Sequence, residues 1–212
     1  MLAQRVDLRK LKPEKKLSFL KKAAQILAAG DLVIYPTDTA YALGANALDE
    51  AAVAKVFQLK QRPRHKALSV LVSSVAMAKK YTQWNARAQE LAQRFLPGPL
   101  TLVVAQKTKL FPSLLTAGGA TIGLRIPAAK TALTLAEIAG FPITATSVNI
   151  SGEQPCYNLE QLAAVFQRAP VKMILDQGAL PPILPSTIVD VTQQPPRILR
   201  QGPIKAAELG LD

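Results

Sequence analysis

The residues best suited to chemistry in this sequence fall into two short groups, one cationic and one neutral and polar. The cationic group is the run Lys60-Gln61-Arg62-Pro63-Arg64-His65-Lys66. It follows a segment with helical periodicity, and Pro63 prevents that helix from continuing, so the cations enter a loop. They could bind the phosphates of a polyphosphate, but basic residues at a helix end also complement the helix dipole. The run alone leaves both interpretations open.

The neutral group is TATSVNISG, residues 144–152, in which Ser147 and Asn149 stand two positions apart. It follows a short apolar run, as does the segment Pro36-Thr37-Asp38-Thr39. Open α/β sheets bind ligands at strand ends, but Ser and Asn also form ordinary turns, so each segment alone is weak evidence for a site. The phosphate-binding motifs GxxxxGK[ST] and GxGxxG do not occur. A phosphate site would therefore depend on side-chain cations and isolated backbone donors.

The elements that must position these groups follow from apolar periodicity and capping residues. Helices are predicted over 14–29, 49–59, 74–80, 86–96, 130–139 and 159–168. Strands are predicted over 32–36, 67–72, 101–106, 121–127, 143–146, 171–176, 186–192 and 197–200. This interleaving indicates an α/β or α+β domain with a mixed sheet of seven or eight strands. Alternation in strand 121–127 makes Arg125 project opposite the apolar face, and the proline-rich loop 177–185 is the best candidate for a mobile segment.

The composition describes a strongly basic globular chain of 212 residues with 26 Lys and Arg, 14 Asp and Glu, and a net charge of +12. A hydrophobic content of 49% excludes a disordered basic tail, and one Cys excludes a disulfide framework and a paired-Cys zinc site. Without an apolar run of membrane-spanning length or a signal-peptide pattern, a cytoplasmic protein that does not enter a membrane is expected. Eight of the cations lie in the first 22 residues, where they form either a solvated face or an arm that contacts RNA.

Seven segments, taken together in order, resemble the YrdC-like threonylcarbamoyl-AMP synthase family in its short single-domain form. They are YPTDTAYALGANA (35–47), KQRPRHKALSVLV (60–72), FLPGPLTLVV (95–104), TIGLRIP (121–127), TATSVNISG (144–152), PSTIVDV (185–191) and ILRQGPI (198–204). The family signatures KxR and SxN are present as Lys60-x-Arg62 and Ser147-x-Asn149. The resemblance covers residues 18–204, which sets 1–17 apart as a basic N-terminal extension and 205–212 as a C-terminal tail.

The resemblance implies a twisted mixed β-sheet of about seven strands flanked by helices, with a basic concave face. It also implies an enzyme, L-threonylcarbamoyladenylate synthase, which is a nucleotidyltransferase. Such an enzyme joins L-threonine, bicarbonate and ATP into threonylcarbamoyl-AMP and releases pyrophosphate. The product is used for threonylcarbamoyladenosine modification of tRNA by downstream tRNA threonylcarbamoyl transferase proteins. Mg²⁺ is expected to enter with ATP, bound mainly by substrate oxygens and water rather than by the protein.

The resemblance further implies a role for each matching residue. The residues expected to bind threonine are Thr39, Arg125 and Ser147, with Arg125 on the carboxylate. Those expected to bind ATP are Lys60, Arg62, Lys66, Thr121, Asn149, Ser186 and Arg200, with Arg200 closing over the nucleotide. The catalytic set is expected to be Lys60, Arg62, Ser147 and Asn149.

Some residues depart from the family pattern. Asp38 stands where the family usually has Glu, and Ala40-Tyr41-Ala42 where it usually has Val-Tyr-Gly. Val148 replaces the common Ala inside SxN, and Cys156-Tyr157 replaces a usual Pro-Thr pair. The first two departures would reshape the threonine pocket, and the last would change a nucleotide contact. Cys156 itself is expected to be a bystander and His65 a residue at the rim of the site.

Two hypotheses compete with the synthase. One is a non-catalytic double-stranded RNA or tRNA-binding protein of the same fold, which would use the same basic surface. The aromatic content of 5% weakens recognition of unpaired bases by stacking but leaves duplex recognition open. The other is a diverged paralogue without activity, which typically loses the SxN signature. Only the enzyme needs Lys60, Arg62, Ser147 and Asn149 intact, and this chain has all four.

Overall fold

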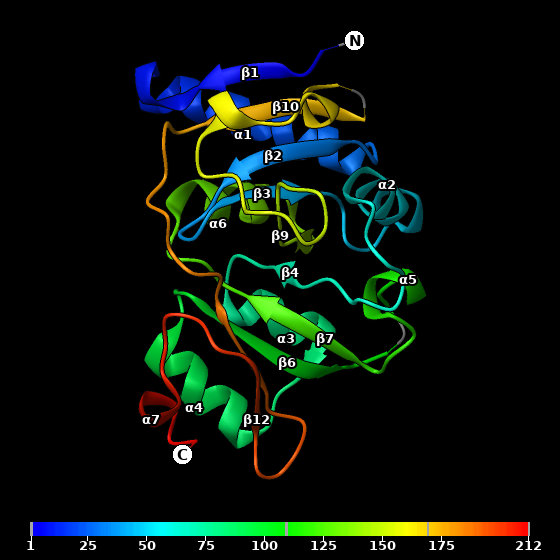
Figure 1. The fold of residues 1–212 in the computed structure, drawn as a ribbon, viewed down its shortest axis with the longest axis vertical. Coiled ribbons are helices and arrows are strands. Elements are labelled where there is room, and N and C mark those ends of the chain that lie inside the picture. The colour runs from blue at the N-terminus through cyan, green and yellow to red at the C-terminus, as the bar shows by residue number, and fades with distance from the viewer. Residues whose placement is uncertain (1, 109, 169, 212) are drawn as a thin grey trace.

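Two mixed β-sheets form the framework of the protein in a computed structural model that describes residues 2–108, 110–168 and 170–211 (Figure 1). The first sheet lies in the upper half of Figure 1, in the order Gln4–Asp7 (β1), Val171–Asp176 (β10), Leu32–Pro36 (β2), Tyr41–Gly44 (β3) and Thr146–Ser147 (β9). The second lies in the lower half, in the order Arg197–Arg200 (β12), Thr187–Asp190 (β11), Leu100–Gln106 (β6), Thr121–Arg125 (β7), Val70–Leu71 (β4) and Ile143–Thr144 (β8). Thr82–Gln83 (β5) pairs with β6 as a seventh strand. The predicted mixed α/β fold is confirmed, with its strands divided between two sheets.

Helices surround both sheets, and most begin where the sequence predicts. They are Pro13–Ala28 (α1), Glu50–Lys60 (α2), Val75–Tyr81 (α3), Ala86–Phe95 (α4), Ser113–Thr116 (α5), Lys130–Ala139 (α6) and Ala206–Leu209 (α7). The side chains of Asp49, Ser74 and Asn85 accept hydrogen bonds from backbone N–H groups in the first turns of α2, α3 and α4. These caps satisfy donors that a helix start leaves unpaired, which is why each helix begins there.

The inner strands of the first sheet are buried on both faces. Helices α1 and α6 pack together against one face, where Val33 and Tyr35 of β2 belong to the same buried cluster as Ala23 and Leu27 of α1. Ile34, which points the other way, packs in the cluster that contains α2. A strand that is covered on both faces has apolar residues at consecutive positions, which explains the sequence LVIYP.

The structure differs from the sequence prediction at both chain ends. Gln4–Asp7 is an edge strand parallel to β10, and Val6 and Leu8 are buried, so part of the segment 1–17 belongs to the domain. The many cations in residues 1–17 hide the short alternation of apolar and polar residues in β1, so the sequence pattern did not predict this strand. In the segment 205–212, α7 places Leu209 in the core, where it is 0% exposed.

The helix predicted over 159–168 is wrong. Two short 3₁₀ helices, Leu159–Gln161 and Ala164–Gln167, stand there, and the extended backbone of Leu162 separates them. Leu159, Leu162 and Phe166 are all buried. Their spacing fits a 3₁₀ turn as well as an α-helix, so the periodicity could not distinguish the two.

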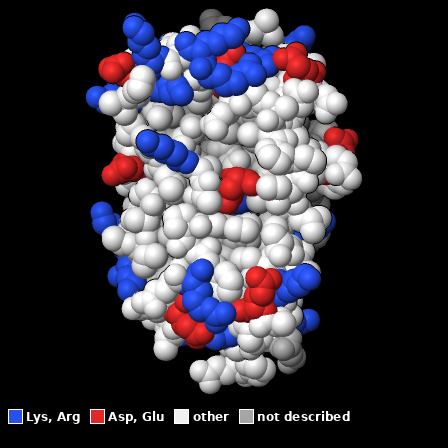
Figure 2. Space-filling model, turned by 90° about the vertical axis from the view of Figure 1, so that its left-hand side faces the viewer, with Lys and Arg blue, Asp and Glu red and all other residues white. Residues whose placement is uncertain are grey.

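Cationic side chains gather at the end of the molecule that carries β1 and α1 (Figure 2). The exposed members of this group include Lys10, Lys12, Lys15, Lys21 and Lys22. Arg5 differs, because it pairs with the buried Asp176 and with Glu160, and Arg9 pairs with Asp7. Over the described ranges, none of the helices combines the length and apolar character that crossing a bilayer requires.

Candidate functional site

A cavity of about 220 Å³ receives side chains from both sheets. The predicted site residues that line it are Thr39, Lys60, Arg62, Arg125, Ser147, Asn149, Ser186 and Arg200. Four of these are cationic, so the predicted basic concavity is present as this cavity. Segments separated by up to 163 positions in the sequence meet here, because strands that are distant in the chain are neighbours in the sheets.

Strand register builds the floor of the cavity on the second sheet. Arg125 of β7 pairs with Thr101 of β6, Thr101 with Ile188 of β11, and Ile188 with Arg200 of β12. Directly paired residues project from the same face of a sheet. The four side chains therefore form one row across four strands, and all four line the cavity.

Two predicted site residues lie outside this lining. Thr121 stands at the other end of β7 from Arg125, and four strand residues span about 13 Å. The side chain of Lys66 is exposed, although its carbonyl accepts a hydrogen bond from Arg62 Nε at 2.9 Å. The parts assigned to both residues in ATP binding stay predictions without support from the cavity.

Lys60 joins the KxR and SxN segments directly. It is the last residue of α2 and only 1% exposed, and its Nζ donates to Ser147 O at 2.5 Å, Asn149 O at 2.8 Å and Asn149 Oδ1 at 2.9 Å. Ser147 Oγ also donates to Asn149 Oδ1, at 2.6 Å. The two signatures, 87 positions apart along the chain, form one hydrogen-bonded unit.

Burial lowers the pKa of Lys60 from 10.5 to about 7, and the charge of Arg62 adds to this shift. Between these two pH values the unfolded chain holds a proton that the folded chain has lost, so folding stability rises with pH there, by at most about 1.4 kcal/mol per unit. We expect the free energy of unfolding of the wild type, relative to Lys60→Met, to increase from pH 7 to pH 9. Urea denaturation at several pH values measures this difference. Parallel pH dependences of the two proteins would contradict the prediction.

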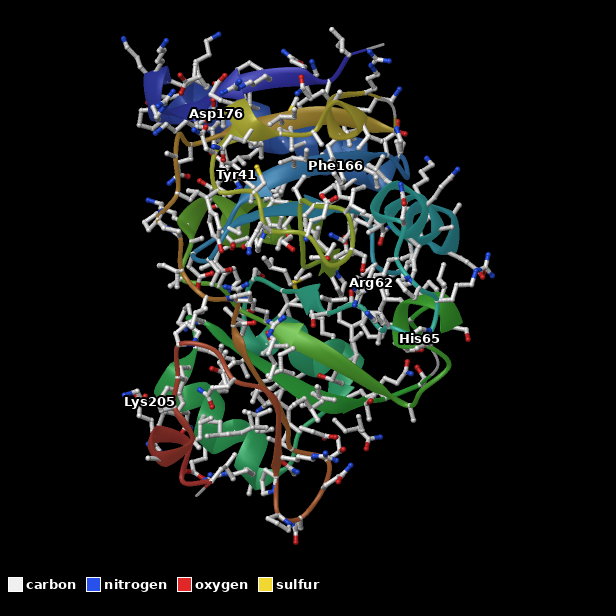
Figure 3. All side chains as sticks on the ribbon, viewed as in Figure 1. Tyr41, Arg62, His65, Phe166, Asp176 and Lys205 are labelled. Atoms are coloured by element: carbon white, nitrogen blue, oxygen red, sulfur yellow. The ribbon has the colours of Figure 1, made fainter. Side chains whose placement is uncertain are left out.

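Arg62 is fixed by the loop that follows it. Gln61 adopts a left-handed conformation (φ 50°) that ends α2, and Arg62 then donates to the carbonyls of Lys66 and Ala67, the latter at 2.6 Å. Partial burial lowers the pKa of its guanidinium. The neighbouring His65 is exposed, does not line the cavity, and lies farther toward the edge of the molecule than Arg62 (Figure 3).

Arg125 is held from the opposite side of the cavity by the turn between β2 and β3. Its Nη2 pairs with Asp38 and its Nη1 donates to Thr39 Oγ1 at 2.9 Å, while Asp38 Oδ2 accepts from Ala128 N. Burial lowers the pKa of Arg125, and the carboxylate of Asp38 opposes that shift. Arg125 Nε is buried without a partner among the described residues. A guanidinium has five N–H groups, and Thr39 and Asp38 take one each, so the fixed guanidinium keeps donors that a ligand could use.

Arg200 is the last residue of the row on the second sheet, and Ser186 lies beside it. Arg200 Nε and Nη2 donate to Ser186 O at 3.1 and 2.8 Å, and Ser186 Oγ lies 2.7 Å from Thr101 Oγ1. Burial lowers the pKa of Arg200, and the charges of Arg125 and Arg62 lower it further. Mutual repulsion of this kind favours an anionic ligand, which would restore the balance of charge.

The proline-rich segment 177–185, named here the strap, runs from β10 to β11 and contributes Ile183 and Pro185 to the cavity wall. It is ordered by two tyrosines. Tyr41 Oη donates to Gly178 O at 2.6 Å. Tyr41 lies close to the buried Asp176, and both are labelled in Figure 3. Tyr157 accepts from Leu180 N through its carbonyl at 2.8 Å and donates from Oη to Ile183 O at 3.2 Å.

Tyr157→Phe is expected to loosen the strap with little effect on the rest of the fold. The hydroxyl makes one hydrogen bond in a partly exposed place, so its loss lowers the free energy of unfolding by about 0.5–1 kcal/mol. Limited proteolysis would show faster cleavage within 177–185 than in the wild type. Tyr157→Ala, which also removes the ring, should accelerate cleavage more than Tyr157→Phe, and equal rates for all three proteins would contradict the prediction.

Sequence reasoning missed several residues of this site. Tyr157 and Ile183 meet only through the strap, and Thr101 reaches the cavity only through the register of β6. Asp38 was predicted to stand at a strand end and to depart from the family pattern, but nothing in the sequence indicated that its carboxylate holds Arg125. The one available signal for Asp38 was its position at a strand end beside Thr37 and Thr39. Cys156 does not line the cavity, and burial raises the pKa of its thiol.

The donors around the cavity do not suit a metal ion held by the protein. Among the described lining residues none carries a carboxylate, and over the described part of the chain no three His, Cys, Asp or Glu side chains gather as a metal site requires. What the lining offers is hydroxyl groups, amide and carbonyl oxygens, and four cationic side chains. This arrangement suits a ligand with several negative charges.

Comparison with known proteins places the chain among relatives of the same fold. A Pyrococcus abyssi threonylcarbamoyl-AMP synthase is 38% identical over 90% of this chain and 56% of that protein, so the chain spans little more than half of it. A Mycobacterium tuberculosis protein that bears the same name provisionally is 38% identical over 94% of this chain and 93% of its own length.

Solved structures agree with these relatives. The structure of Pyrococcus abyssi Sua5 complexed with L-threonine has a TM-score of 0.88 and 34% identity, and the match covers 99% of this chain and 60% of that one. Escherichia coli YciO has a TM-score of 0.81 and 25% identity, with 98% of each chain covered. Residues 25–202 match the Sua5/YciO/YrdC family, which carries the description "Telomere recombination". Because that match takes in both signatures and most of both sheets, the chain belongs to the Sua5/YciO/YrdC family.

Proposed function

We propose that this protein is an L-threonylcarbamoyladenylate synthase, which makes threonylcarbamoyl-AMP and pyrophosphate from L-threonine, bicarbonate and ATP. The observation that carries the proposal is the cavity that Lys60, Arg62, Arg125 and Arg200 line together with the SxN loop. Relatives named for this activity, and a threonine-bound structure of one of them, support it. These relatives directly support an enzymatic function for this protein. That the enzyme is a nucleotidyltransferase is part of the proposal.

Arg125 is the group best placed to bind the threonine carboxylate. It is buried, Asp38 and Thr39 fix its orientation, and Nε still has a donor to offer. A guanidinium with a fixed plane binds a carboxylate through two parallel hydrogen bonds. Thr39 Oγ1, which accepts from Arg125 Nη1, lies within reach of the same ligand. The threonine end of the cavity is thus the end nearest the β2–β3 turn.

The phosphates of ATP fit the opposite end, between Arg62 and Arg200. Both arginines line the cavity, and the pKa of each is lowered by burial, so a bound polyanion would stabilise the charges of both. Ser186 and Asn149 supply neutral polar groups beside them. Fixed cations of this kind stabilise charge that develops on phosphate oxygens during transfer.

The proposed chemistry needs no side-chain nucleophile. The ammonium group of threonine first loses a proton, and the resulting amine condenses with bicarbonate to a carbamate, with release of water. A carbamate oxygen then attacks the α-phosphorus of ATP, a new P–O bond forms, and the bond from that phosphorus to pyrophosphate breaks. Positioning and charge neutralisation account for most of the acceleration of such a transfer. The single Cys156 and the exposed His65 are therefore not required.

Mg²⁺ enters this proposal only with ATP. Because the described lining lacks carboxylates, the substrate phosphates and water would supply its ligands. The delivery of the product to tRNA threonylcarbamoyl transferase proteins, and a cytoplasmic location, likewise remain predictions from the resemblance.

The test is the release of pyrophosphate from ATP in the presence of bicarbonate, measured with and without L-threonine. We expect release that requires threonine, and a fall of at least about tenfold in Arg62→Gln, because one charge-assisted contact to phosphate is worth about 1.5–3 kcal/mol. Arg64→Gln, whose exposed side chain does not line the cavity, serves as the matched control. Absence of threonine-dependent release by the folded wild type would refute the synthase.

A non-catalytic RNA-binding protein explains the structure less well, because it has no need of the Lys60, Ser147 and Asn149 unit. RNA binding as an additional property is a separate question, which the exposed lysines of α1 raise. Binding to an RNA duplex should then weaken steeply as salt increases. Salt-independent binding, or none at low salt, would exclude it.

A further inference from the structure

Every donor of the Lys60 side chain is already used within the protein. The side chain has three N–H donors as an ammonium and two as a neutral amine, and three oxygens of Ser147 and Asn149 lie within hydrogen-bond distance of Nζ to accept them. The side chain is 1% exposed, so water does not replace any of these partners. A phosphate could bind Nζ only if one of these bonds were broken, which would take a donor away from a backbone carbonyl or from Asn149 Oδ1.

The same residue fixes the loop from both ends. The carbonyl of Lys60 accepts from Ser151 N at 2.8 Å, while its side chain holds the carbonyls of Ser147 and Asn149. Asn149 Nδ2 donates to Glu153 O at 2.7 Å, which completes the turn. The end of α2 therefore serves as the template on which residues 147–151 take their shape.

This template determines what Ser147 can offer a ligand. Asn149 Oδ1 accepts from both Lys60 Nζ and Ser147 Oγ, so the hydroxyl proton of Ser147 is committed to it. Ser147 Oγ can then act toward the cavity only as an acceptor. An N–H or O–H donor on the ligand suits it, and a phosphate oxygen does not.

We propose that Lys60 is a positioning residue, which acts through the 147–151 loop and sets Ser147 as a hydrogen-bond acceptor, while Arg62 and Arg200 bind the phosphates. In the synthase of the proposed function, the donor that faces Ser147 Oγ is the amine or hydroxyl of threonine. Where Lys60 is protonated, its ammonium also adds positive charge to the cavity that it lines.

Hydrogen–deuterium exchange of the protein without substrates tests the positioning role by itself. Lys60→Met keeps most of the length of the side chain and removes every donor, so exchange of the amides in 147–152 should rise at least about tenfold. Arg62→Gln is the matched control, and it should raise exchange only in 62–68, where Arg62 holds two carbonyls. Unchanged exchange of 147–152 in Lys60→Met would overturn the proposal. If Lys60→Met does not fold, the exchange of the amides in 147–152 is measured in Lys60→Arg instead. A planar guanidinium cannot reach all three oxygens from one nitrogen atom, so the same increase in exchange is expected.

Ligand binding separates the two roles of the cations. Inorganic pyrophosphate, titrated by calorimetry, should bind at least about tenfold more weakly to Arg62→Gln and less than about fivefold more weakly to Lys60→Met. In the synthase assay, Lys60→Met should lower kcat with little change in the KM for ATP. The reverse pattern, with pyrophosphate affinity lost in Lys60→Met and kept in Arg62→Gln, would make Lys60 a phosphate ligand. The exchange and titration measurements need no turnover, so they distinguish failure of this proposal from failure of the synthase.

Discussion

Replacing Arg125 by alanine is expected to lower kcat/KM for L-threonine by at least about 100-fold. The guanidinium is the only buried cation on the threonine side of the described cavity, and Asp38 and Thr39 fix it before any ligand binds. Two charge-assisted hydrogen bonds to a carboxylate, at about 1.5–3 kcal/mol each, account for a loss of this size. Initial rates of pyrophosphate release over a range of threonine concentrations measure it.

The same substitution should destabilise the fold, because it leaves the carboxylate of Asp38 partly buried beside an empty space. Removing one partner of a buried ion pair lowers the free energy of unfolding by about 3 kcal/mol or more. Arg125→Ala combined with Asp38→Ala should recover much of this stability without recovering activity. Arg125→Lys keeps the charge and should lie between the wild type and alanine in activity. An unchanged KM for threonine in Arg125→Ala would remove this residue from the threonine site.

Gly202→Ala is expected to lower the free energy of unfolding by about 3 kcal/mol and to weaken ATP binding. A Cβ atom there would lie 2.5 Å from Thr187 N and 2.7 Å from Ser186 C, and closer still to Pro185 O. These are backbone atoms, which cannot rotate away as a flexible side chain would, so the chain itself must shift. The shifted segment carries Ser186 and supports Arg200, which explains the expected effect on ATP.

Gly140→Ala is the matched control for this prediction. Its Cβ would meet nothing within 4 Å, although its φ of +76° disfavours alanine by about 1 kcal/mol. Urea denaturation of the two variants should therefore differ by about 2 kcal/mol, and only Gly202→Ala should change the affinity for ATP. Equal stabilities would show that the backbone near Ser186 yields easily.

The elements that could be predicted from the sequence are those that carry a local signal. LVIYP indicated a buried strand because it is covered on both faces, and Asp49 and Asn85 marked helix starts through hydrogen bonds to their own neighbours. Tyr41–Gly44 was missed because YALG has no alternation or β-branched residue. It is a strand because its backbone pairs with β2 and with β9, and pairing of that kind is absent from local sequence.

In the candidate site, too, some features have a local signal in the sequence and others depend on distant parts of the chain. The family resemblance implied that KxR and SxN belong to one site, but nothing local indicated that Lys60 would bind the loop itself from 87 positions away. Strand alternation correctly placed Arg125 opposite the apolar face, yet alternation cannot distinguish it from Thr121, which shares that face at the far end of β7. Which end of a strand faces a cavity depends on what the other sheet places above it.

The position of β10 in the first sheet has a consequence for synthesis of the chain. β10 lies between β1 and β2, and it pairs in parallel with both. β1 and β2 therefore do not pair with each other. Each can pair with β10 only after the chain has been synthesised as far as Asp176. On the ribosome, the N-terminal half would emerge with open strand edges, and contacts across so many residues form slowly. Chaperones that cover exposed edges, or slow translation before residue 171, would then affect the yield of this protein more than that of a domain whose neighbouring strands pair in order.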